Sequence, residues 1–229
     1  MLQLLSCACG LHVLLIRHGE TSWNVEGRVQ GSADSALTEQ GVQQAIATGR
    51  RLSGGAVRAV YSSPLPRARR TAELIVNELS FEPALHVLEE PRLAERSFGI
   101  FEGQRWSAIR EKYPLELAAS QADPGYAMPD GESRLQVVDR AYDFLQTLAE
   151  AGGAAGTGSR GAVVVVTHSG LISCVLKRIL GLEQQQPRTF DVPNLGIIDL
   201  EWAPGGEWLV RTLGDVAHLE SISTGPRWG

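Results

Sequence analysis

The sequence predicts a single α/β domain, a three-layer sandwich whose mostly parallel central sheet carries an antiparallel edge. Short apolar segments alternate with segments in which apolar residues recur at helical spacing, the pattern of strands linked by helices. Near the end of the chain, residues 196–202 and 207–213 are joined through "APGG", which is typical of a hairpin. At 229 residues, the chain is long enough for one large domain with a full core.

The first third of the chain alternates strands and helices. Residues 13–17 form a buried strand, and Thr38 can cap a helix whose apolar residues recur every three or four positions. Residues 56–61 form a second strand. After it, Ser62 or Ser63 can cap a helix that opens with proline.

The middle of the chain is less regular. Residues 84–89 form a third, weaker strand, and residues 91–132 are rich in Pro and Gly with one or two short helices. Ser133 and Gln136 make a capping box for a long amphipathic helix. Residues 151–161 lack the Lys-Ser/Thr ending of a phosphate-binding loop and are interpreted as a flexible connection.

The segment "AVVVVTHSG", residues 162–170, is the most hydrophobic strand, as expected for a central parallel strand covered on both faces. Residues 171–180 form the helix that follows, with Cys174 as a core residue. The predicted boundaries are an N-terminal extension at 1–12 and one domain at 13–229, in which 91–132 form a lid over the substrate.

Composition excludes several classes of partner. The net charge of -5 and the sequence pI of about 5.6 argue against nucleic acid or an anionic membrane, and no apolar run reaches membrane-spanning length. Three cysteines, an odd number, fit a reducing compartment, and Cys7 and Cys9 have no nearby metal ligands in the sequence. We expect the protein to be located in the cytoplasm, and an organelle such as a plastid stays open as an alternative. A homodimer also stays open.

Polar residues gather where the predicted parallel strands end, the edge at which open α/β sheets bind ligands. Arginines beside histidines repel a metal cation but suit a phosphoryl group, which they bind and neutralise. The Gly-x-Ser-x-Gly elbow of a serine hydrolase is absent from the sequence. The residues expected at this edge are Arg17, His18, Gly19, Glu20, Thr21, Asn24, Ser62, Ser63, Arg67, Arg69, Glu95, Thr167, His168, Ser169 and Gly170.

Five blocks of sequence together carry a family resemblance: "LLIRHGETSWN", "SSPLPRARRTAELI", "RLAERSFGIFEG", "PDGES" and "VVVTHSG". In this order they resemble the histidine phosphatase superfamily, with its phosphoglycerate mutase-like fold. The resemblance covers nearly the whole chain after residue 12. The closing "GDVAHLES" is similar to the tails of bacterial and plant members that act as phosphatases.

No metal or cofactor is expected for the phosphatase, and the resemblance implies a role for each residue of the site. His18 would be the nucleophile and would attack through one ring nitrogen, while a main-chain carbonyl holds the other ring nitrogen. Gly19 would let the backbone turn sharply at this point. Glu95 would donate a proton to the leaving group and later accept one from water. Arg17, Arg67 and His168 would surround the phosphoryl oxygens. The residues expected to bind substrate are Gly19, Glu20, Thr21, Asn24, Gln30, Gly31, Arg69, Ser169 and Gly170.

Three functions stay open for such a site: a phosphatase for a small phosphomonoester, a cofactor-dependent phosphoglycerate mutase, and a non-catalytic protein that binds phosphorylated ligands. The 72 residues between Glu95 and His168 contain no adjacent basic pair. Members that resemble true mutases have a longer segment with such a pair, so we favour the phosphatase. The candidate walls of the lid, for which structural packing is an equally good explanation, are Trp106, Tyr113, Tyr126 and Met128.

Overall fold

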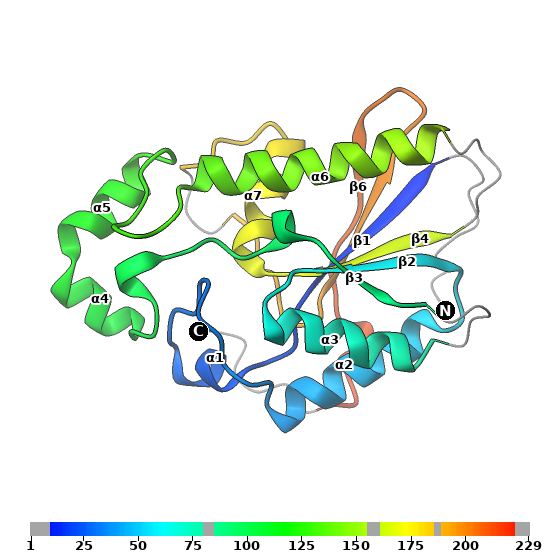
Figure 1. Cartoon of the computed structure of the whole chain (residues 1–229), viewed down its shortest axis with the longest axis horizontal. Helices are drawn as coiled ribbons and strands as arrows, with labels where there is room; N and C mark the ends of the chain where they lie inside the picture. The colour runs from blue at the N-terminus through cyan, green and yellow to red at the C-terminus, as the bar shows by residue number, and fades with distance from the viewer. Residues whose placement is uncertain (1–9, 80–84, 155–160, 186–188, 223–229) are drawn as a thin grey trace.

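A computed structural model describes residues 10–79, 85–154, 161–185 and 189–222. Its strands form one six-stranded sheet with the order β3-β2-β4-β1-β5-β6 (Figure 1). The first four strands in this order pair in parallel, whereas β5 pairs antiparallel with β1 and with β6, which confirms the predicted antiparallel edge. The strands are β1 (Leu11–Arg17), β2 (Val57–Ser62), β3 (Val87–Glu89), β4 (Ala162–Thr167), β5 (Ile197–Trp202) and β6 (Trp208–Asp215).

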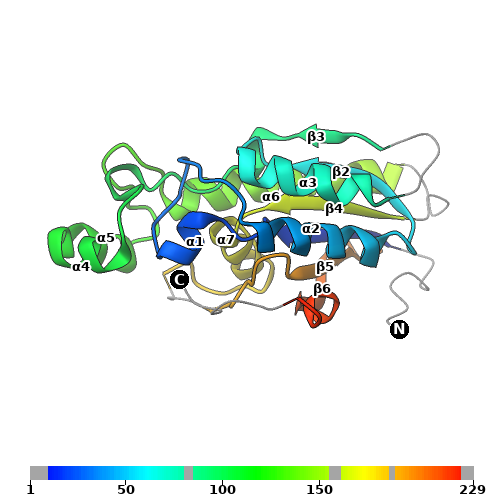
Figure 2. The same ribbon diagram turned by 90° about the horizontal axis from the view of Figure 1, so that it is seen from below.

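Helices cover both faces of the sheet, which gives the predicted three layers. In Figures 1 and 2, α2 (Glu39–Leu52) and α3 (Pro66–Asn77) lie on one face, and α6 (Arg134–Ala154) and α7 (Ser169–Ile179) lie on the other. The shorter helices are α1 (Ser22–Glu26), α4 (Trp106–Lys112) and α5 (Pro114–Ala122), with 3₁₀ helices η1 (Pro91–Leu93), η2 (Gly99–Phe101) and η3 (Ala217–Leu219).

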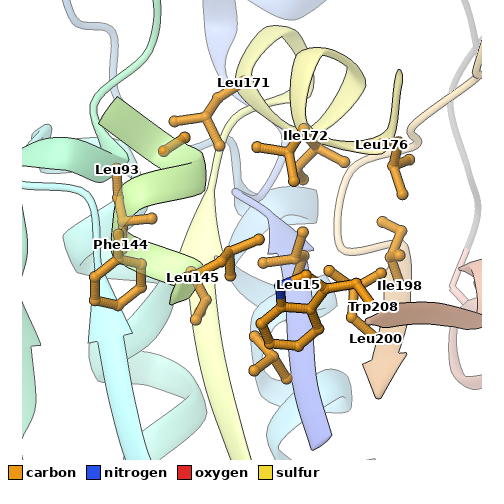
Figure 3. Close-up of a cluster of buried hydrophobic side chains, with 14 of the residues drawn as sticks. Leu15, Leu93, Phe144, Leu145, Leu171, Ile172, Leu176, Ile198, Leu200 and Trp208 are labelled. Atoms are coloured by element: carbon orange, nitrogen blue, oxygen red, sulfur yellow. The ribbon is translucent and has the colours of Figure 1, made fainter. Parts of the chain in front are cut away.

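The central strands supply side chains to two cores, because successive residues of a strand point to opposite faces. Leu15 of β1 belongs to the core on the α6 and α7 side, together with Phe144 and Ile172 (Figure 3). Leu14 and Ile16 belong to the core on the α2 and α3 side. Every residue of β4 is buried, as predicted for a strand covered on both faces. Two packed faces therefore hold the strand ends rigidly.

Two of the predicted helix caps are confirmed. The Thr38 hydroxyl accepts the backbone N–H of Gly41 at 3.0 Å and begins α2. The Ser133 hydroxyl accepts the N–H of Gln136 at 3.2 Å, and the Gln136 side chain accepts the Ser133 N–H at 2.8 Å. This reciprocal pair is the capping box expected before α6.

The cap predicted for the helix after β2 is wrong. Helix α3 begins at Pro66 after Leu65, and neither Ser62 nor Ser63 caps it. The Ser62 hydroxyl donates to the Ser63 carbonyl at 2.8 Å, and the Ser63 hydroxyl is used in the site described below. Pro66 has a preset φ and no N–H to satisfy, so it starts the helix without a side-chain cap.

Several predicted boundaries move. Strand β1 begins at Leu11, inside the expected extension 1–12, because its backbone continues to pair with β5 there. Strand β3 is limited to Val87–Glu89, where it pairs with β2. Helix α6 continues to Ala154, into the expected connection. The rest of the predicted extension, third strand and connection lies outside the described residues. These parts are residues 1–9, which include Cys7 and Cys9, residue 84 and residues 155–160.

The predicted lid, residues 91–132, contains η1, η2, α4 and α5, and its two α-helices extend beyond the sheet on the side of α1 (Figure 1). It has a small core built on Val29, Phe101, Ile109 and Met128. The other three predicted wall residues, Trp106, Tyr113 and Tyr126, pack against this core. Packing thus accounts for all four positions. In the described part of the chain, no helix has the length and apolar character of a membrane span.

Candidate active site

His18 lies immediately after β1 and is held by several hydrogen bonds. Its backbone nitrogen donates to the Thr167 carbonyl at 2.9 Å, and its own carbonyl accepts the Asn194 side chain at 2.8 Å. The ring atom Nδ1 lies 2.7 Å from the Gly19 carbonyl oxygen. Because a carbonyl can only accept, Nδ1 carries the proton in the neutral ring, and the lone pair is on Nε2.

Gly19 is needed here for space. A Cβ at this position would lie 2.8 Å from the carbonyl oxygen of Gly41, closer than real Cβ contacts allow. The Gly19 N–H donates to the Thr71 hydroxyl at 3.0 Å. Gly19 is not among the glycines with positive φ, so the close contact between two backbones is what requires glycine here.

His168 follows the central strand β4 and is fully buried. Its ring centroid is 5.2 Å from that of His18. Its Nε2 lies 2.8 Å from the Ser63 hydroxyl, while its Nδ1 is buried and has no hydrogen-bond partner among the described residues. The hydroxyl of Ser63, just after β2, therefore orients His168.

Arg67 occupies the first turn of α3 and is 2% exposed. Its Nη1 donates to the Ala33 carbonyl at 2.7 Å and to the Asp34 carboxylate at 3.1 Å, and its Nη2 donates to the Gly31 carbonyl at 2.7 Å. The Nε atom is buried and unpaired within the described chain. One turn of chain, residues 31–34, thus holds the guanidinium by its two outer nitrogens.

Arg17 presents a similar arrangement at the end of β1. Its Nη1 donates to the Val192 carbonyl at 2.7 Å, and its Nε is buried without a partner in the described structure. Buried polar atoms normally have partners. The unpaired nitrogens of Arg17, Arg67 and His168 therefore suit an anion that brings several acceptor oxygens.

The charges and burial of this cluster change the pKa values of its members. Burial, followed by the positive charges of Arg67 and Arg17, holds the pKa of His18 well below its usual range. The pKa of His168 is also well below its usual range, through burial first and then the Arg67 charge. Burial lowers the pKa of Arg17 to about 10, so it stays charged at neutral pH. The site therefore pairs neutral imidazoles with cationic guanidiniums.

Glu95 is held at the start of α7. Its carboxylate accepts the backbone N–H groups of Arg96 at 2.9 Å, Gly170 at 3.1 Å and Leu171 at 3.2 Å. Burial lowers the pKa of both Arg17 and Arg67, and the negative charge of Glu95 opposes that effect on each. The structure thus brings the predicted carboxylate to the arginines and histidines of the cluster.

Four other candidates near His18 form bonds within the protein. Thr21 and Asn24 make the capping box of α1, each side chain accepting the backbone N–H of the other. The Glu20 carboxylate accepts the Thr38 hydroxyl at 2.8 Å, and the side-chain amide oxygen of Gln30 accepts a serine hydroxyl at 3.3 Å. These contacts stabilise the loop after β1. The candidates Ser169 and Gly170 lie half-buried at the start of α7.

Arg69 is not part of the cluster. Its guanidinium is exposed and pairs with Glu73 and with Glu89, each at 3.1 Å. Two residues along a helix correspond to a rotation of about 200°, so a helix that points Arg67 inward points Arg69 away. The expectation that Arg69 lines the substrate pocket is therefore replaced by a surface ion-pair role.

Sequence reasoning missed two contributors. The sequence predicts Ser63 as a helix cap and a strand-end residue but not its bond to His168, and no local pattern indicates Asn194, which binds the His18 carbonyl. A signal for Asn194 exists in the topology. Strand β5 runs antiparallel to β1, so the residues just before it lie at the edge where the parallel strands end.

The chain is also similar to known proteins over most of its length. Residues 13–215 match the model of the histidine phosphatase superfamily (branch 1). A relative from Escherichia fergusonii named probable phosphoglycerate mutase GpmB is 34% identical over 219 residues, covering 92% of this chain and 96% of the relative. Two solved structures extend the comparison.

Bacillus stearothermophilus YhfR superimposes with a TM-score of 0.80 and 30% identity, covering 92% of this chain and 100% of that one. A mycobacterial glucosyl-3-phosphoglycerate phosphatase, in complex with VO3, gives a TM-score of 0.77 and 27% identity, covering 89% of this chain and 99% of that one. The sequence match, the shared fold and the two buried histidines among arginines lead to the same assignment. The chain belongs to the histidine phosphatase superfamily.

Proposed function

We propose that this protein is a metal-independent phosphatase that hydrolyses a small phosphomonoester through a phosphohistidine on His18. The observation that carries the proposal is the Nδ1 contact of His18 with the Gly19 carbonyl, which leaves the lone pair on Nε2. The lowered pKa of His18, caused first by burial, keeps that lone pair available at neutral pH. Arg17 and Arg67 neutralise the phosphate dianion that the imidazole approaches.

The reaction proceeds in two transfers. The Nε2 lone pair of His18 attacks phosphorus, the bond from phosphorus to the ester oxygen breaks, and Glu95 gives a proton to the departing alkoxide. Water then attacks the phosphohistidine while its proton passes to Glu95. The phosphorus–nitrogen bond breaks, which releases inorganic phosphate and restores both His18 and the protonated Glu95. Residues Arg17, Arg67 and His168 stabilise the charge that develops on the phosphoryl oxygens.

The proposed covalent intermediate can be trapped. After brief mixing with labelled substrate, an alkaline quench should preserve label on the protein, whereas an acid quench should destroy it because phosphohistidine is acid-labile. His18→Ala should acquire no label, while His86→Ala, a change at an exposed histidine, should label normally. Acid-stable label, or label in the His18 variant, would contradict the proposal.

Metal independence follows from the residue types. Two arginines adjoin the histidines, and a divalent cation would be repelled by them. Activity should therefore survive exhaustive treatment with EDTA. Loss of activity that magnesium or zinc restores would show that the site has been misinterpreted.

A second candidate is a cofactor-dependent phosphoglycerate mutase, which the names of the curated relatives favour. The phosphatase is supported by the absence from the sequence of an adjacent basic pair between Glu95 and His168, and by the solved phosphatase structure of similar fold. With 3-phosphoglycerate and 2,3-bisphosphoglycerate supplied, inorganic phosphate should form faster than 2-phosphoglycerate. Faster isomer formation would establish the mutase instead.

A further inference from the structure

Glu102, which follows η2 in the lid, accepts an unusual number of hydrogen bonds. Burial alone would raise its pKa, but the bonds from the backbone and from serine hydroxyls lower it below the usual range. The carboxylate therefore stays ionised and can hold all its donors. These donors are the backbone nitrogens of Ser32 (2.9 Å), Ala33 (3.1 Å) and Phe98 (2.8 Å) and the hydroxyls of Ser32 (2.9 Å) and Ser97 (3.2 Å).

The turn that Glu102 binds is the same turn that holds Arg67. The N–H of Ser32 donates to Glu102, and the carbonyl of Gly31, which belongs to the same peptide group, accepts Nη2 of Arg67 at 2.7 Å. The next residue, Ala33, also contacts both groups, with its N–H donating to Glu102 and its carbonyl accepting Nη1 of Arg67 at 2.7 Å. The backbone of the turn thus connects a carboxylate on one side to a guanidinium on the other.

This arrangement has two physical consequences. Hydrogen bonds in a chain polarise one another, so the carboxylate strengthens the carbonyl acceptor that shares a peptide group with its donor. The carboxylate also fixes the orientation of the turn. The turn then determines which nitrogen of the Arg67 guanidinium has no partner within the protein and can bind another group. With both Nη atoms of Arg67 engaged, its Nε is the buried nitrogen that has no partner among the described residues.

Gly31 shows how closely Glu102 fits the turn. Its φ of +57° favours glycine, and a Cβ there would overlap Oε1 of Glu102. Any side chain at position 31 would displace the carboxylate. The sequence predicts Gly31 in the substrate pocket, and this contact supplies a separate reason for glycine at that position.

We propose that Glu102 is a positioning residue that acts through Arg67: it holds the turn at residues 31–34 so that Arg67 meets the phosphoryl group in a fixed orientation. The inference rests on the proposed function, because Arg67 must bind a phosphoryl group for its orientation to matter. Glu102 itself makes no contact with the reacting atoms in this account. Glu102 should therefore stabilise the transition state, and this stabilisation should disappear when the guanidinium of residue 67 is absent.

A double-mutant cycle tests this dependence. Glu102→Gln keeps the size of the side chain but removes the charge, and Arg67→Lys keeps a charge but cannot occupy both carbonyls of the turn. We expect Glu102→Gln to lower kcat/KM for p-nitrophenyl phosphate about tenfold in the otherwise natural protein, mainly through kcat, and less than about twofold in the Arg67→Lys background. Orthovanadate affinity should follow the same pattern.

Two further variants guard the interpretation. Ser97→Ala changes no residue of the turn and removes one bond to Glu102, together with longer contacts of the same hydroxyl to Ser32 (3.5 Å), Gly99 (3.4 Å) and Asp130 (3.4 Å). It should lower kcat/KM about two- to threefold without preventing folding. It also serves if Glu102→Gln fails to fold. Glu78→Gln, which breaks a surface pair with Arg50, should leave activity unchanged.

The outcomes separate the two proposals. If the natural protein is active and Glu102→Gln lowers kcat/KM by the same factor in the otherwise natural protein and in the Arg67→Lys background, Glu102 acts independently of Arg67. The positioning role is then wrong. The same conclusion follows if both Glu102→Gln and Ser97→Ala fold and retain full activity. If the natural protein neither hydrolyses phosphomonoesters nor binds orthovanadate, the proposed function fails, whatever the variants do.

Discussion

The carboxylate of Glu95 accepts the backbone N–H of Gly170 at 3.1 Å, across 75 positions of sequence. This bond joins the segment after η1 to the first turn of α7, two residues after His168. A Cβ on Gly170 would lie 2.6 Å from Oε1 of Glu95. The position of the proposed proton donor therefore depends on the absence of a side chain at residue 170.

Gly170→Ala should accordingly displace Glu95 and slow the reaction. General acid catalysis contributes about 10²–10⁴-fold, and a displaced donor should lose part of it, so we expect kcat for an alkyl phosphate to fall about 10- to 100-fold. Gly54→Ala, at a glycine with open space around it, is the matched control and should retain full activity. Steady-state kinetics measures both, and an unimpaired Gly170→Ala would show that Glu95 tolerates displacement.

Glu95→Gln should distinguish substrates by their leaving groups. Glutamine keeps the size of the side chain but cannot supply the acid proton. An alkoxide leaves slowly without a proton, whereas p-nitrophenolate leaves readily, so phosphoryl transfer from an alkyl phosphate should slow far more than transfer from p-nitrophenyl phosphate. Single-turnover phosphorylation of the enzyme is the required measurement, because Glu95 also acts in dephosphorylation. Equal slowing of both substrates would reassign Glu95 to positioning.

The imidazoles of His18 and His168 should stay neutral in mildly acidic solution. Burial and the charges of Arg67 and Arg17 lower both pKa values, so the ring signals in ¹⁵N NMR should not shift between pH ~5.5 and 8, where an ordinary histidine titrates. Arg67→Gln removes one repelling charge and should raise the pKa of His18. Titration of His18 near its usual value in the natural protein would contradict the environment described here.

A pH-dependent contribution to stability is expected from His12. Its Nδ1 lies 2.9 Å from the Asp199 carboxylate, and that hydrogen bond raises the pKa of His12 against the opposing effect of burial. The pKa of His12 is higher in the folded protein than in the unfolded chain. The stabilisation is therefore complete at pH values below the unfolded-state pKa and disappears as the pH rises through the folded-state pKa. The difference in unfolding free energy between the natural protein and His12→Gln, on the order of 1 kcal/mol, should therefore shrink from pH ~5.5 to 8.5.

Chemical denaturation at the two pH values measures this difference. Glu201 and Arg211 also act on His12, the first raising and the second lowering its pKa, after the larger effects of Asp199 and burial. The Glu201–Arg211 ion pair is present in both the natural protein and the variant, so its own contribution cancels in the comparison. A difference that grows with pH would show that His12 is not stabilised by Asp199 in its protonated form.

The fold could be predicted because its signals are local and periodic. The apolar runs of β1 and β4, the cap at Thr38 and the box at Ser133 each depend on residues a few positions apart, and the structure confirms them. The role of Ser63 could not be predicted in the same way. Its hydroxyl is taken by His168, which is 105 positions away in sequence.

The sequence by itself determined which residue types reach one edge of the sheet, because the carboxyl ends of parallel strands always meet there. That reasoning places Arg17, His18, Arg67, Glu95 and His168 at this edge among other polar residues, and the family resemblance implies their roles. Only the tertiary structure decided that Arg69 points away, that Ser63 and Asn194 hold the two histidines, and that Glu102 connects to Arg67. These contacts join distant segments through single peptide groups and side chains, whose orientation depends on how the loops pack rather than on any repeating pattern along the chain.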